Sequence, residues 1–250
     1  MTDCIETADS LKHQIDCVMG RIPCELRLQN VRLVDVFSGE IIDGADIFID
    51  KGKIIDAGRD CRASALETIN LNGALVAPGL IDAHVHIESG MLTPIQFARL
   101  IAPYGTTTIV ADPHEIANVA GIQGIRFMMQ EAKEAEITVR FMLPSCVPAT
   151  PFETSGATLA AGDLTDLMGK DEVLGLAELM NVPGVLSCDP DILKKVLLTR
   201  AHGKLIDGHS PLTAGAALSA YALSGVTSDH ECSTEEEVSD RVSRGMTIFM

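Results

Sequence analysis

The pattern of apolar and polar positions changes character at about residue 73. Before that point, an amphipathic helical pattern covers about residues 8–19, and it is followed by short runs in which apolar and polar residues alternate, separated by turn residues. These strand-like runs are 24–37, 41–50 and 53–57. We therefore expect a helical segment over 1–24 and a small β-sandwich built from hairpins over 25–73. This part contains no cluster of catalytic residue types, so we interpret it as structural.

From residue 74 onward, apolar strand-like runs alternate with helical patterns. The predicted strands are 74–86, 106–111, 138–144, 173–180, 204–209 and 226–230, with a seventh starting at 246. The predicted helices are 94–102, 118–135, about 161–168, 192–202, 213–223 and 234–244. Repeated βα units predict an α/β fold with a parallel sheet, and seven strands without a return favour a TIM-type (β/α)8 barrel over an open sheet.

The last stretch of the chain, residues 245–250, is apolar and has no terminating signal. A barrel of this type requires an eighth strand and its helix. We therefore expect the chain to be a fragment of a longer protein, with an incomplete barrel over 74–250.

The most informative motif is His84-Val85-His86, at the end of a continuously apolar run. Side chains at i and i+2 of a strand point to the same side, so one metal ion can bind both imidazoles. The continuous apolar run predicts a strand that is buried on both faces. The alternative for an isolated His-x-His is one core histidine beside a solvated one.

The remaining histidines strengthen the metal interpretation. Five of the seven lie at the carboxyl ends of predicted strands, where the chemistry of a barrel takes place: His84, His86, His114, His209 and His230. Glu178 lies at the end of the fourth predicted strand. Imidazole and carboxylate groups in such a set are suitable ligands for one or two divalent cations.

Composition excludes several other classes of function. The net charge of −16 argues against a non-specific nucleic-acid surface, and 4% aromatic residues with no tryptophan argue against base stacking. The chain has no apolar stretch of about 18 residues, so the sequence predicts no membrane-spanning helix, and residues 1–6 do not resemble a secretory signal. Seven scattered cysteines without a Cys-x-x-Cys pair fit reduced thiols in a cytoplasmic protein.

The strand-end motifs resemble those of a known superfamily. The string from Gly79 to His86 is similar to the first-strand motif of the amidohydrolases, and His209 and His230 match their fifth- and sixth-strand histidines. Four longer strings together resemble the bacterial adenine deaminase family within that superfamily. They are His84-Val85-His86-Ile87-Glu88-Ser89, Asp112-Pro113-His114-Glu115-Ile116-Ala117-Asn118, Ala177-Glu178-Leu179-Met180-Asn181 and Asp207-Gly208-His209-Ser210-Pro211.

The resemblance implies two divalent cations per site, with His84 and His86 binding one and His209 and His230 the other. Many members bridge their two metals with a carbamylated lysine, but the fourth predicted strand contains no lysine, and Lys170 lies at its wrong end. The resemblance assigns the bridge to Glu178. Mn²⁺ is favoured and Fe²⁺ or Zn²⁺ is possible, since these ligand types accept several metals.

The implied reaction is the hydrolytic deamination of adenine to hypoxanthine and ammonia by a metal-bound hydroxide. Protonation of the leaving amine requires a general acid, for which Glu115 and Asp112 are the candidates. Glu88, Ser89 and His114 are expected to bind the purine. For Asp112-Pro113 the alternative is a turn that caps the next helix.

The resemblance also implies a homo-oligomer, expected to be a dimer, and a metal-binding aspartate on the eighth strand, so we expect a protein ending at Met250 to be inactive. Two alternatives stay open at this point. One is an amidohydrolase acting on another heterocycle or a cyclic amide, and the other is a non-catalytic barrel that would contain no stoichiometric metal.

Overall fold

The structure is a computed structural model that describes residues 7–150 and 152–250. The chain divides into two compact units, Met1–Pro78 and Gly79–Met250. Residues 1–6 of the predicted N-terminal segment lie outside the described residues. Nowhere in the described ranges is there a helix both long and apolar enough to cross a membrane.

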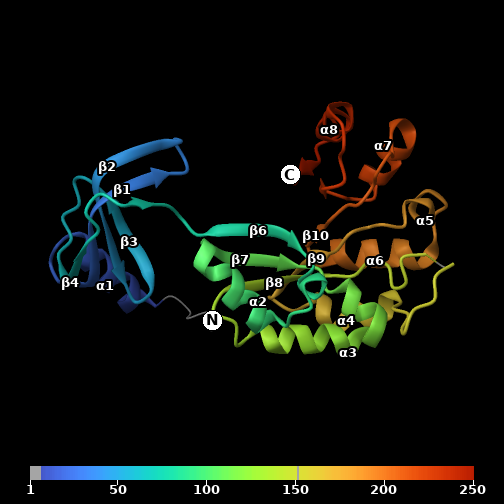
Figure 1. The fold of residues 1–250 in the computed structure, drawn as a ribbon, viewed down its shortest axis with the longest axis horizontal. Coiled ribbons are helices and arrows are strands. Elements are labelled where there is room, and N and C mark those ends of the chain that lie inside the picture. Colours follow the sequence, from blue (N-terminus) through green and yellow to red (C-terminus); the bar gives the residue numbers. More distant parts are fainter. Residues whose placement is uncertain (1–6, 151) are drawn as a thin grey trace. The chain divides into compact units, whose positions relative to one another are not determined.

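The N-terminal unit is a mixed β-sheet with one helix beside it (Figure 1). The hydroxyl of Thr7 caps the helix by accepting a hydrogen bond from the backbone N–H of Ser10. The strands follow the order β3-β2-β1-β4, with β5 also paired to β1. The elements are α1 (Ala8–Val18), β1 (Cys24–Asp35), β2 (Glu40–Asp50), β3 (Lys53–Gly58), β4 (Ala65–Asn70) and β5 (Leu75–Val76).

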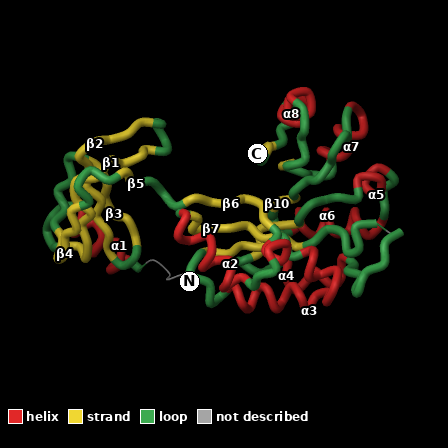
Figure 2. The backbone as a smooth tube through the Cα atoms, viewed as in Figure 1, coloured by secondary structure: helices red, strands yellow, loops and turns green. Residues whose placement is uncertain are grey.

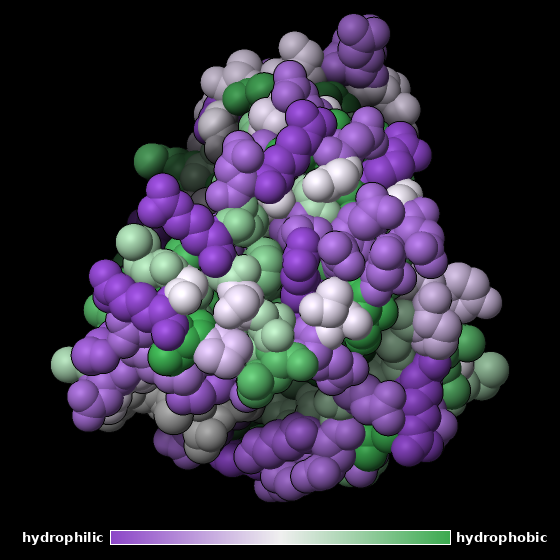
Figure 3. Space-filling view, turned by 90° about the vertical axis from the view of Figure 1, so that its left-hand side faces the viewer, coloured by the Kyte–Doolittle hydropathy of each residue, from purple (hydrophilic) through white to green (hydrophobic). Residues whose placement is uncertain are grey.

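This unit corresponds only in part to the predicted sandwich. The two hairpins β1–β2 and β2–β3 are antiparallel, as expected. β4 and β5, however, pair in parallel with β1, so all of these strands join one sheet in the described part of the unit. β4 was not predicted from the sequence, because most of its residues are exposed and it therefore lacks apolar alternation. The face turned toward the viewer in Figure 3 is mostly hydrophilic, with small apolar patches between the polar side chains.

The C-terminal unit is a curled parallel sheet in which spatial neighbours are also neighbours along the chain (Figures 1 and 2). The order is β6-β7-β8-β9-β10. A hydrogen bond of 3.0 Å from Thr227 N to Ile206 O continues it to the parallel pair of β11 and β12. Helices α2, α3, α4 and α6 lie along one side of the sheet. The predicted α/β fold, an incomplete (β/α)8 barrel, is confirmed.

The strands of this unit are β6 (Leu80–Val85), β7 (Thr106–Ala111), β8 (Thr138–Leu143), β9 (Val173–Leu176), β10 (Leu205–Ile206), β11 (Ser228–Asp229) and β12 (Thr247–Ile248). The α-helices are α2 (Pro94–Ile101), α3 (His114–Ala132), α4 (Ala161–Met168), α5 (Val182–Leu186), α6 (Pro190–Ala201), α7 (Gly215–Leu223) and α8 (Glu235–Val242). Short 3₁₀ helices occur at η1 (Ile87–Gly90) and η2 (Ala102–Tyr104). Their buried side chains form one apolar core that includes Ile109, Phe141, Leu164 and Leu176.

The prediction of a single strand over 74–86 is wrong. Its first part is β5, which pairs with β1 of the N-terminal unit, and its second part is β6. The break falls at Pro78-Gly79, where a Cβ on Gly79 would lie 2.1 Å from the Thr107 hydroxyl. The predicted burial on both faces is also wrong, because β6 is an edge strand of the described sheet and Leu80 and Ile81 are 60% and 68% exposed.

Candidate metal centre

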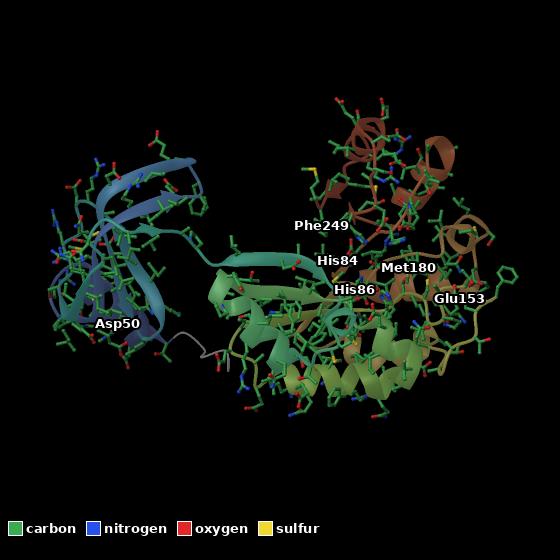
Figure 4. All side chains as sticks on the ribbon, viewed as in Figure 1. Asp50, His84, His86, Glu153, Met180 and Phe249 are labelled. Carbon is green, nitrogen blue, oxygen red and sulfur yellow. The ribbon has the colours of Figure 1, made fainter. Side chains whose placement is uncertain are left out.

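The two histidines of the first motif face each other at the carboxyl end of β6 (Figure 4). Their Nε2 atoms are 3.2 Å apart, as the i, i+2 spacing on a strand predicts. The other nitrogen of His86, Nδ1, lies 3.1 Å from the backbone oxygen of Asp112 at the end of β7. This contact orients the His86 ring so that Nε2 points toward His84.

Glu178 lies at the centre of the histidines. It follows β9 by two residues, and its side chain is only 4% exposed. Its Oε1 atom lies 2.8 Å from His84 Nε2, 3.3 Å from His86 Nε2, 3.0 Å from His230 Nε2 and 3.8 Å from His209 Nδ1. The structure therefore brings the five predicted metal ligands together. Glu178 lies near both the pair His84 and His86 and the pair His209 and His230.

His114 and Asp112 join the same cluster. His114 Nδ1 lies 2.8 Å from Asp112 Oδ2 and 3.7 Å from Glu178 Oε2, so it is as near to Glu178 as His209 is. Ligand atoms of His86, Asp112, His114 and Glu178 lie within 4.8 Å of one another. Helix α3 begins at His114, four residues before its predicted start, which places Glu115 in its first turn.

The residues present fit a divalent cation. Three buried side-chain atoms of the cluster have no hydrogen-bond partner among the described residues: Asp112 Oδ1, His209 Nδ1 and His230 Nδ1. Burying polar atoms without partners is costly, so such a concentration calls for a ligand. Nitrogen and carboxylate oxygen donors at these spacings are those that Zn²⁺, Mn²⁺ or Fe²⁺ bind.

The electrostatics of the cluster show mutual stabilisation of opposite charges. Burial would raise the pKa of Glu178, but the imidazoles of His209, His230, His84 and His86 face its carboxylate, outweigh burial and hold that pKa well below the usual range. Burial would lower the pKa of His84, but the carboxylates of Asp207 and Glu178 raise it to about 10. For His86, Glu178 outweighs burial and raises the pKa to about 9. Without a cation, His84 and His86 therefore hold protons that a metal must displace.

This gives a pH-dependent prediction. The raised pKa values of His84 and His86 contribute stability to the metal-free protein below the ordinary histidine pKa of 6.5, and this contribution is lost as the pH rises toward 9–10. Metal binding requires deprotonated imidazoles, so metal-dependent stabilisation increases over the same range. We expect the difference in Tm between Mn²⁺-loaded and chelator-treated protein to widen by at least about 2–4 °C between pH 6.5 and 8.5. Thermal melts at the two pH values measure it, and a constant or shrinking difference would contradict the assignment.

Asp207 is a contributor that the sequence analysis did not single out. Its Oδ2 lies 3.2 Å from His84 Nδ1, and its Oδ1 accepts hydrogen bonds from Ser228 Oγ at 2.6 Å and from the backbone of Gly208 at 2.9 Å. A carboxylate behind a metal-binding histidine fixes the ring's orientation and tautomer. Its position at the end of a predicted strand, two residues before His209, is the feature of the sequence that could have indicated this role. Gly208 allows the close approach of β11, because its Cβ would lie 2.4 Å from Ser228 O.

Asp207→Asn is expected to lower metal affinity about 10–100-fold without abolishing the site, because such outer carboxylates orient a ligand rather than bind the ion. Metal titration of the chelator-treated protein, followed by elemental analysis, measures the change. Asp240→Asn, on α8, is the matched control and should leave affinity unaltered. A wild-type affinity in Asp207→Asn would show that His84 needs no support from this carboxylate.

Three of the predicted substrate and acid residues, Glu88, Ser89 and Glu115, form a second group at the start of α3. Ser89 Oγ lies 2.5 Å from Glu115 Oε1, and the backbone N–H of Ile116 donates to Glu88 Oε1 at 3.1 Å. Glu88 Oε2 is buried and has no hydrogen-bond partner among the described residues. Burial also raises the pKa of Glu88. The 3₁₀ helix η1 thus carries Glu88 and Ser89 from the metal histidines to the α3 N-terminus.

Other strand-end residues have structural partners. The Asp229 carboxylate forms a fully buried ion pair of 2.8 Å with Arg241, which holds the loop at Ser210 through a hydrogen bond to its backbone oxygen. Glu231, directly after His230, lies 3.8 Å from His209 and 3.7 Å from His230. It is 39% exposed, and so lies at the rim of the cluster.

The sheet of βα units and the cluster of histidines around a glutamate together define a class of metal-binding barrel. The amidohydrolase family model matches residues 75–248, and the chain belongs to this family. The sequence is 49% identical to an adenine deaminase of Clostridium acetobutylicum over 95% of this chain and 41% of the relative. It is 48% identical to an adenine deaminase of Methanoregula boonei over 94% of this chain and 41% of the relative. The chain thus spans about two fifths of the length of these curated relatives.

Solved structures agree on the fold. A mutant atrazine chlorohydrolase from Arthrobacter aurescens TC1, crystallised with zinc and atraton, superposes with a TM-score of 0.66 over 90% of this chain and 65% of that chain. Their sequences are only 16% identical. This similarity supports the amidohydrolase barrel and does not bear on the substrate.

Proposed function

We propose that the protein catalyses the hydrolytic deamination of adenine to hypoxanthine and ammonia. The observation that carries the proposal is the convergence of His84, His86, His209 and His230 on Glu178 at the carboxyl ends of the sheet. A second support is sequence identity: the chain is 46–49% identical to proteins named adenine deaminase over nearly its whole length.

In this proposal the cluster holds two divalent cations, with Mn²⁺ favoured over Fe²⁺ or Zn²⁺. His84 and His86 belong to one, His209 and His230 to the other, and the two carboxylate oxygens of Glu178 are available to both. Such cations supply a hydroxide nucleophile at neutral pH, because they lower the pKa of water toward 7. His114 and Asp112 lie within reach of the first pair, and so fit either an additional ligand role or contact with the substrate.

The second group supplies proton transfer and purine binding. Glu115 is the proposed proton donor to the leaving amine, and the Ser89 hydroxyl holds its Oε1 in place. Asp112 is the second candidate, since burial raises its pKa despite the hydrogen bond from His114. The free Oε2 of Glu88 is suited to hydrogen-bond the edge of the purine ring. The backbone N–H of Ile116 holds the other oxygen of Glu88 and fixes its direction.

The test is an ammonia-release assay with the full-length protein and added Mn²⁺. Adenine, guanine, cytosine and a cyclic amide are compared at equal concentration, and hypoxanthine is quantified by chromatography. We expect release from adenine alone. If another heterocycle or the cyclic amide is turned over in preference to adenine, the proposed metal centre stands but the proposed substrate is wrong. No turnover of any compound by metal-loaded protein would favour a non-catalytic barrel.

We also infer a cytoplasmic location and a homodimer. The six cysteines in the described part of the chain are free thiols, which suits a reducing compartment. The dimer rests on the family resemblance, and sedimentation of the full-length protein tests it.

A further inference from the structure

We propose that the N-terminal unit holds a second metal site, formed by His13, Cys17 and Asp50, that is separate from the catalytic centre. The cluster lies wholly within Met1–Pro78 and shares no residue with the histidines around Glu178. None of His13, Cys17 and Asp50 belongs to the strand-end motifs of the C-terminal unit. The proposal does not depend on the proposed deaminase activity.

The geometry of the cluster suits one ion. His13 and Cys17 are four residues apart on α1, so their side chains lie on the same face of the helix. His13 Nε2 lies 3.0 Å from Asp50 Oδ2 and 3.7 Å from Cys17 Sγ, and all three ligand atoms fall within 4.8 Å of one another. Two ligands on a tetrahedral ion with bonds of about 2.0–2.3 Å are separated by roughly 3.3–3.8 Å. The two separations from His13 Nε2 therefore lie within about 0.3 Å of this range.

The backbone fixes the position of the carboxylate. Asp50 is the last residue of β2 and pairs with Lys53 across the turn to β3. Lys51 and Gly52 in that turn both have positive φ, 49° and 73°, as a tight two-residue hairpin requires. The Glu25 carboxylate accepts a hydrogen bond of 3.0 Å from the Lys51 N–H and holds the turn. Figure 4 shows Asp50 within this unit.

The burial and charge of the three groups point to a cation. Cys17 is 0% and Asp50 2% exposed, whereas the His13 side chain is 33% exposed. When the thiol loses its proton to solvent and the sulfur binds the metal, one thiolate and one carboxylate balance a divalent ion. Three protein ligands leave the fourth position of a tetrahedral ion to a water molecule. A mixed sulfur, nitrogen and oxygen set favours a borderline-soft ion such as Zn²⁺, in contrast to the catalytic cluster, which has no sulfur ligand.

Sulfur coordination gives this site its own spectroscopic signature. Chelator-treated full-length protein is titrated anaerobically with Co²⁺, and thiolate-to-Co²⁺ charge-transfer absorption is followed in the near ultraviolet. The nitrogen and oxygen ligands around Glu178 give no such band, so the readout is independent of catalysis. Co²⁺ also fills the cluster around Glu178, but without a thiolate band. We therefore expect the amplitude of the band, once all sites are filled, to correspond to one thiolate-bound Co²⁺ per chain, and we expect the band to disappear when Zn²⁺ is added in competition.

Variants assign the band to its ligands. Cys17→Ser should abolish it, and His13→Gln and Asp50→Asn should each weaken Co²⁺ binding by at least about tenfold. Cys61→Ser is the matched control, because Cys61 packs against the same small core but lies outside the cluster, and its band should be unchanged. If Cys17→Ser fails to fold, the half-exposed His13→Gln carries the test. Absence of the band in wild-type protein, its survival in Cys17→Ser, or unaltered affinity in His13→Gln would overturn the proposal and leave a simple His13–Asp50 hydrogen bond.

Discussion

Glu178→Gln is expected to lower metal content and deaminase activity together in the full-length protein. The Glu178 carboxylate lies within 4 Å of a nitrogen of each of five histidines. An amide keeps the shape of the side chain but removes its negative charge and one of its two acceptor oxygens. Outer residues that merely orient ligands already change metal affinity about 10–100-fold, so the loss for a central ligand should be at least that large. Elemental analysis after dialysis measures metal, and ammonia release measures activity.

Glu134→Gln, at an exposed position after α3, is the matched control and should retain both properties. Unchanged metal stoichiometry in Glu178→Gln would exclude Glu178 as a bridging ligand. A fall in activity with full metal content would instead place Glu178 among the proton-transfer groups.

Glu115→Gln is expected to leave metal content intact and to reduce kcat about 10²–10⁴-fold, the usual contribution of one well-placed general acid. The substitution removes a proton donor but preserves the size of a side chain that contacts Ser89. Metal analysis and steady-state kinetics on the same preparation separate the two effects.

Glu131→Gln, near the other end of α3, controls for a change of charge on that helix. A loss of metal in Glu115→Gln would make Glu115 a ligand. A loss of rate below about tenfold would make it a bystander, and the acid would then have to be sought at Asp112 or His114.

The fold was largely readable from periodicity where the elements are long or well bounded. β7 and α4 have the predicted bounds. Gly105 and Asp112-Pro113 flank β7, and Gly169 follows α4. The run over 74–86 was misread because an apolar run does not record which sheet its residues join. Pro78-Gly79 was the local signal of the break, but only the pairing of β5 with β1 shows that the run serves two units.

For the candidate site, sequence spacing could predict which side chains gather at one end of the sheet but not their mutual distances. The nearness of His114 to Glu178 depends on α3 starting at once after Pro113, and Asp112-Pro113 gave no unique start. The support of His84 by Asp207 depends on the curl of the sheet, which brings the ends of β6 and β10 together although they are at opposite ends of its strand order. No linear pattern contains that information.

The sequential strand order has a consequence for folding kinetics. Each strand from β6 to β10 pairs with its predecessor, so the sheet can grow by one βα unit at a time through short loop closures. The histidine cluster instead joins His84 in the first of these strands to His230 after β11, and it is completed only when the last units have docked. The contacts between a bound cation and its ligands therefore form late in folding and are absent from an early transition state. Chelation should therefore speed unfolding while leaving the refolding rate nearly unchanged.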